Sequence, residues 1–82
     1  KHMEKQGVTN EDIRALLENR AVDTFLQLTE LGMTPVLSVR LALRFQGIMQ
    51  KTHLINAVNI AMDLGKDPIE QEKLIMRIMQ NA

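Results

Sequence analysis

The fold is decided by Leu31-Gly32-Met33-Thr34-Pro35, a stretch that returns 33 residues later as Leu64-Gly65-Lys66-Asp67-Pro68. Each copy has a glycine, expected to end a helix in the left-handed conformation, followed by a side-chain oxygen and a proline at the first position of the next helix. Thr34 and Asp67 are the expected caps, and Glu70 completes a capping box with Asp67. Both stretches therefore predict a helix, a tight turn and a second helix.

The sequence match continues on both sides of these turns. Charge or apolar character is kept in the pairs Glu30 and Asp63, Val36 and Ile69, Arg40 and Lys73, Leu41 and Leu74, Leu43 and Met76, Arg44 and Arg77, and Phe45 and Ile78. We therefore predict two pseudo-repeated αα-hairpins that are joined through Lys51 and Thr52.

A further helix is expected before the hairpins. Thr9 and Asp12 form a capping-box pattern, and Val8 is placed to pack against Ile13. The apolar positions then shift around the helix axis, so one straight helix would not keep them on a single core. We predict a break near Asn19, with helices over about residues 10–18 and 20–31.

The three remaining helices complete the predicted fold class, which is all-α: a small bundle of five helices, with a short N-terminal helix followed by two pseudo-repeated αα-hairpins. The third helix is expected from Pro35 to about Gln50, the fourth from about Thr52 to Leu64, and the fifth from Pro68 to near Gln80. Because the third helix is apolar over most of its circumference, we expect it at the centre of the domain.

Length and composition bound the classes of protein that the chain can represent. We expect one helical domain over residues 8–82, preceded in residues 1–7 by a tag remnant, Lys1-His2-Met3, and a flexible N-terminus. The chain has no cysteine and two histidines, so no disulfide framework, metal site or cofactor is predicted. No apolar stretch approaches the roughly 18 residues of a membrane span. A cytoplasmic protein without membrane contact is therefore the expectation.

The fifth helix carries more apolar residues than a terminal helix needs for one buried side. We expect a cover for this surface, which can be the domain's own core, a second copy of the chain or a different protein. The predicted partner-binding residues are Ile69, Leu74, Ile75, Met76, Ile78 and Met79. Among the other methionines, Met49 is expected in the core and Met33 at the surface.

A basic strip is predicted along the third helix, formed by Arg40, Arg44 and Lys51. Arginines four residues apart on a helix repel each other mildly, so a negative group is expected nearby. That group can be nucleic-acid phosphate, an acidic partner, or the domain's own carboxylates at Glu18, Asp23, Glu30 and Asp63. The formal net charge of zero argues against bulk attraction to nucleic acid or to anionic membranes.

Enzymatic function has little support, because the chain offers one serine, Ser38, one histidine outside the tag, His53, and no glycine-rich loop. We therefore interpret the sequence as that of a small, non-catalytic, intracellular interaction or regulatory protein. It is expected to dock to a protein partner, as a homodimer through the C-terminal helix. The alternative is a nucleic-acid-binding regulator that uses the basic strip. No small-molecule substrate is evident.

Overall fold

The computed structural model describes residues 7–80, without the side chain of Ile48. Within these residues the chain forms five α-helices and no strand, which confirms the predicted all-α, five-helix fold. The helices are α2 (Asn10–Glu18), α3 (Val22–Glu30), α4 (Pro35–Arg44), α5 (Ile48–Leu64) and α6 (Pro68–Gln80). The predicted tag remnant lies outside the described residues. No helix within residues 7–80 combines the length and apolar character needed to cross a membrane.

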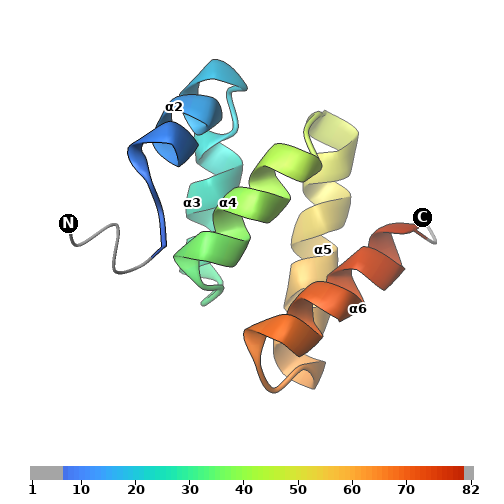
Figure 1. The fold of residues 1–82 in the computed structure, drawn as a ribbon. Coiled ribbons are helices and arrows are strands. Elements are labelled where there is room, and N and C mark those ends of the chain that lie inside the picture. The colour runs from blue at the N-terminus through green and yellow to red at the C-terminus, as the bar shows by residue number, and fades with distance from the viewer. Residues whose placement is uncertain (1–6, 81–82) are drawn as a thin grey trace.

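Helix α4 lies between two hydrophobic clusters. In Figure 1, α2 and α3 are on one side of it and α5 and α6 on the other. It contributes Leu37 and Leu41 to the larger cluster, which contains buried residues of α3, α5 and α6. Its Val39 and Ala42 belong to the smaller cluster with residues of α2 and its flanking turns. The expectation of a central third helix is confirmed.

Three helix starts are capped as the sequence predicts. Thr9 Oγ1 accepts from the backbone N–H of Asp12 at 3.1 Å, and the Asp12 carboxylate accepts from the N–H of Thr9 at 3.0 Å. Thr34 caps α4 through the N–H of Leu37. At α6, Asp67 accepts from the N–H of Glu70 at 2.8 Å. The Glu70 carboxylate accepts from Lys66 rather than from Asp67, so the predicted capping box is displaced by one residue.

The break predicted near Asn19 is present, and α3 begins at Val22 rather than at about residue 20. Arg20 adopts a φ of +54°. Its N–H donates to the carbonyl of Leu17, and the N–H of Ala21 donates to that of Leu16. This is the Schellman pattern of a helix C-terminus, with an arginine at the left-handed position that usually holds glycine.

The boundary between the third and fourth predicted helices was wrong. The sequence predicted a helix to about Gln50 and a connection through Lys51 and Thr52, but α4 ends at Arg44 and both connecting residues lie inside α5. The chain turns at Gly47, which has φ +102° and ψ 150°. That conformation is open almost only to glycine. A glycine is tolerated inside a helical apolar pattern, and that pattern concealed the break.

The two turns of the near-repeat have different backbones. Gly32 has φ +102° as predicted, but the expectation for Gly65 was wrong because its φ is −85° and its ψ 139°. A Cβ atom on Gly65 would lie 3.0 Å from the carbonyl oxygen of Ala61 and 2.9 Å from Cγ of Gln71. Glycine is therefore required there by close packing of α5 and α6. The pseudo-repeat of the two hairpins stays a prediction.

Substitution of Gly47 by alanine tests the turn that ends α4. A Cβ atom at Gly47 would meet nothing within 4 Å, so only backbone strain should act, and we expect Gly47→Ala to lower the free energy of unfolding by about 1–3 kcal/mol. Denaturant unfolding followed by circular dichroism measures this change. Lys66→Ala, in the exposed turn between α5 and α6, is the control and should change stability by less than about 0.5 kcal/mol. Equal stability of Gly47→Ala and the wild-type protein would contradict the strain argument.

Candidate interaction surface

The core of the chain itself covers most of the apolar surface of α6. Ile75 is 0% exposed and belongs to the larger cluster. Leu74, Met76, Ile78 and Met79 are partly buried and pack against that cluster. The prediction that Ile75 binds a partner is therefore corrected, because its side chain has no accessible surface. Of the six residues predicted to bind a partner, Ile69 alone counts as an exposed large hydrophobic, at 68%.

The side of α6 that faces inward includes a position that the sequence did not suggest. Gln71 is buried, four residues before Ile75, and its Cγ lies near Gly65 at the end of α5. Residues four apart lie on one face of a helix, so Gln71 and Ile75 mark the side of α6 that packs against α5. A polar residue at a core position gives no apolar signal, so periodicity could not have identified it.

The opposite side of α6 remains accessible and is hollowed. Its hollow of about 450 Å³ is lined by Ile69, Glu72, Lys73, Met76, Arg77 and Gln80, and we call these residues the α6 outer surface. Its apolar members, Ile69 and Met76, are both among the predicted partner-binding residues. The acidic residue in the first turn of α6 is Glu70 and the basic residue in its last turn is Arg77, so charge changes sign along the helix.

A second hollow, of about 220 Å³, joins the α6 outer surface to α4. It shares Ile69 and Glu72 with the first and adds Val36, Leu37 and Arg40. Val36 is exposed at the start of α4, so apolar side chains from two helices stand beside one another. Nη1 of Arg40 donates to both carboxylate oxygens of Glu72, each at 3.0 Å, and links the two helices across this hollow.

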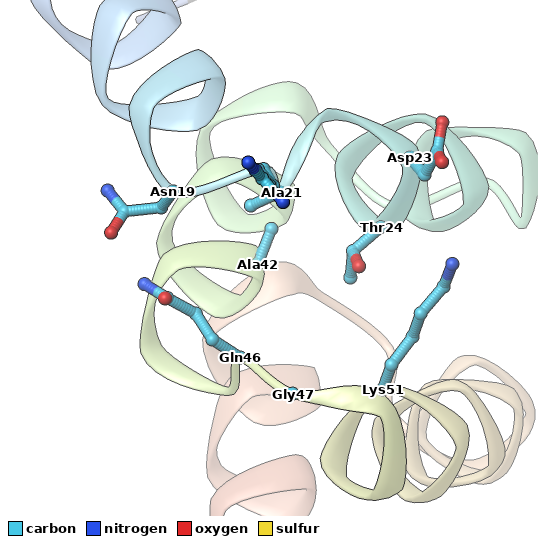
Figure 2. A pocket seen from close by; sticks show the side chains of 9 residues that line it. Asn19, Ala21, Asp23, Thr24, Ala42, Gln46, Gly47 and Lys51 are labelled. Atoms are coloured by element: carbon cyan, nitrogen blue, oxygen red, sulfur yellow. The ribbon is translucent and has the colours of Figure 1, made fainter.

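The predicted basic strip is divided between two helices. Arg40 and Arg44 lie on α4, while Lys51 lies beyond the turn at Gly47, on α5, and lines a separate hollow (Figure 2). Arg40 pairs with Glu72, a carboxylate outside the predicted set. The guanidinium carbon of Arg44 lies 5.8 Å from the centre of the Phe45 ring. These three residues do not form the continuous strip that the sequence predicted.

Several exposed apolar residues were not predicted. Met49 was expected in the core but is 85% exposed, because the unforeseen break places it in the first turn of α5. Met33 was expected at the surface but is 3% exposed. Its N–H donates to the carbonyl of Leu28 at the end of α3, and its side chain packs with Leu28 in the larger cluster. Leu17, Leu26, Ile60 and Leu64 are also exposed. Apolar stripes too wide for one buried face are the signal that could have identified them.

Comparison of the chain with protein-family models, with curated proteins and with solved structures finds no match.

Truncation of Ile75 and of Ile69 tests which side of α6 packs into the core and which side is exposed. Ile75→Ala should lower the free energy of unfolding by about 2–5 kcal/mol because it leaves a cavity in the larger cluster. Ile69→Ala should lower it by less than about 0.5 kcal/mol in the monomer, since an exposed side chain leaves no cavity. Urea unfolding at low protein concentration measures both values. Similar losses in the two variants would contradict this assignment of the faces of α6.

A double-mutant cycle on Arg40 and Glu72 tests the ion pair between α4 and α6. The Arg40 side chain is 58% exposed, so solvent screens the attraction and the coupling free energy should be about 0.2–1 kcal/mol. It is measured from urea unfolding of Arg40→Ala, Glu72→Ala and the double variant, and should fall as salt is added. A coupling near zero in low salt would show that the pair does not contribute to stability.

Proposed function

We propose that this chain is a small, non-catalytic interaction protein that docks a second copy of itself through the α6 outer surface. The observation that carries the proposal is the exposure of Ile69, which stands at the junction of two hollows. Large accessible apolar surfaces rimmed by polar side chains mark interaction sites on soluble proteins. Within residues 7–80, Lys73 and Arg77 form no ion pair, so their charges are available to a partner.

Self-association is favoured by the charge pattern of α6. On the α6 outer surface Glu72 lies nearer the start of the helix and Arg77 nearer its end, so two copies that cross in opposite directions would place Glu72 of each beside Arg77 of the other. A two-fold axis requires this kind of self-complementary surface. Ile69 and Met76 would then be buried between the two helices, with the charges at the rim of the contact.

A weak dimer of this chain would cover a modest share of its surface. A specific interface buries at least about 1,200 Å² in total, or roughly 600 Å² from each copy. The chain exposes 5753 Å², so about a tenth of it would be covered. A domain of this length also buries a small share of its surface when alone, so dimerisation would add stability.

Nucleic-acid binding, the alternative suggested by the sequence, has no comparable support. Arg40 is engaged with Glu72, and Lys51 lies on a different helix from Arg40 and Arg44. Phosphate contacts work through clusters of accessible cations on one face. Docking of a different protein would use the same α6 outer surface, and its partner would need apolar residues flanked by carboxylates that complement Lys73 and Arg77.

The dimer is tested by sedimentation velocity and light scattering over a range of protein concentrations. The wild-type chain should show a reversible monomer–dimer equilibrium. Ile69→Glu should weaken dimerisation by at least about 100-fold, because a two-fold contact buries the new charge twice. Its unfolding at low concentration should be unchanged. Leu17→Glu is the matched control: Leu17 is 64% exposed, similar to Ile69, and lies on α2, so this variant should dimerise normally.

Two results would contradict the proposal. One is a wild-type chain that stays monomeric up to the highest concentration measured. The other is an equal loss of association in Leu17→Glu and Ile69→Glu, which would show a general effect of added charge rather than a contact at α6.

A further inference from the structure

A hollow of about 290 Å³ lies where the two breaks in the helical chain meet (Figure 2). Its wall combines Asn19 and Arg20 from the turn before α3, Thr24 from α3, Gly47 from the turn before α5, and Lys51 from α5. None of these residues belongs to the α6 outer surface, so the hollow is independent of the proposed dimer contact.

Two helices begin at this hollow, and neither start is capped by a side chain. The N-cap residues are Ala21 for α3 and Gly47 for α5, and neither helix has a side-chain cap. The other three helix starts are capped by Thr9, Thr34 and Asp67. The first N–H groups of a helix have no partner inside it, and they carry the positive end of the helix dipole. Backbone donors of α3 and α5 thus remain available beside the hollow.

In contrast, three carbonyl groups at the ends of the preceding helices already accept hydrogen bonds. The Ala15 carbonyl accepts from Asn19 Nδ2 at 2.8 Å, and the Leu43 carbonyl accepts from Gln46 Nε2 at 2.7 Å. The Leu16 carbonyl accepts from the N–H of Ala21 at 2.8 Å. The donors that remain at the hollow are the N–H groups of the two helix starts and the side chains of Thr24 and Lys51, and these suit a ligand with acceptor oxygens.

Thr24 gives an independent indication of a ligand. It is 8% exposed, and its hydroxyl has no hydrogen-bond partner within residues 7–80. Figure 2 shows its side chain directed into the space between α3 and α5, on the side where Lys51 approaches. Because this hydroxyl reaches the hollow, a ligand oxygen there can replace water as its hydrogen-bond partner.

Two cations without ion pairs complete the site. Neither Arg20 nor Lys51 pairs with a carboxylate within the described residues. Arg20 occupies the left-handed position of its turn, at φ +54°, where Gly32 stands in the same turn of α3. A non-glycine residue in this conformation carries a conformational cost that glycine would not. Asp23 also lines the hollow, but in Figure 2 its carboxylate points away from Thr24.

We infer that this hollow binds the phosphate group of a small phosphorylated ligand. A phosphate has several acceptor oxygens around one centre and can accept from two helix starts and from Thr24 at once. Its negative charge is balanced by Arg20 and Lys51. The volume lies at the lower limit of ligand pockets, about 300 Å³, and suits a small ligand rather than an extended one.

The inference is tested by titrating the ¹⁵N-labelled chain with inorganic phosphate at constant ionic strength and following its amide resonances. Saturable shifts are expected in the first turns of α3 and α5. Lys51→Met and Thr24→Val should each weaken phosphate binding about tenfold, as expected for one hydrogen bond to a charged group. Lys66→Met removes an exposed lysine from the turn before α6 and should bind as the wild-type chain does.

Two further variants keep the test valid if the first pair folds poorly. Arg20→Gly removes one cation but relieves the backbone, so it should weaken phosphate binding while raising the melting temperature or leaving it unchanged. Asp23→Asn removes a competing negative charge and should tighten binding severalfold. The inference is overturned if no shift saturates, if all variants bind like the wild-type chain, or if acetate at the same concentration gives the same shifts as phosphate.

Discussion

The structure depends on the burial of α4 from two sides. Its side chains enter both hydrophobic clusters, so this short element links the two halves of the chain, together with the direct contact of α3 with α5. Burial on two sides is possible only if the chain turns away sharply at each end of the helix. Gly32 and Gly47, both with φ of +102°, provide these turns. Without them, the apolar surface of α4 could not be shared between α2 and α3 on one side and α5 and α6 on the other.

This arrangement determines which surfaces are available for function. The inner side of α6 packs into the larger cluster, where Ile75 is fully buried. On the outer side of α6, Ile69 stays accessible beside charged residues that do not pack into the core. The breaks in the chain before α3 and before α5 also bring the uncapped starts of these two helices to one hollow. Both candidate sites are thus consequences of how the central helix is enclosed.

Much of the fold could be predicted because its signals are local. A cap such as Thr9 with Asp12 acts over three residues, and a glycine followed by a capping residue and proline specifies a turn by itself. The break at Gly47 was missed because its neighbours continue the apolar period of a helix. Gly65 was assigned the wrong conformation for a related reason. Its requirement for glycine comes from Gln71, which approaches it from the next helix.

The candidate surface was predicted in part. The C-terminal helix was identified as too apolar for a solvent-exposed helix, but its composition could not say which side would face the core, since apolar residues cover more than half of its circumference. Arg40 and Lys51 were placed on one strip because a continuous helix was assumed. The pairing of Arg40 with Glu72 joins residues 32 positions apart, and no local pattern predicts it.

The sequence by itself determined the all-α class, the number of helices within residues 7–80 and most of their starts, because capping and turn formation depend on groups a few residues apart. The tertiary structure alone decided that Ile75 is buried while Ile69 is exposed, and that Lys51 lies with Thr24 rather than with Arg40. These outcomes depend on burial, which is set by contacts between helices distant in the chain. The near-repeat located the turns at Gly32 and Gly65, and the packing around α4 decided which side chains remain free to bind.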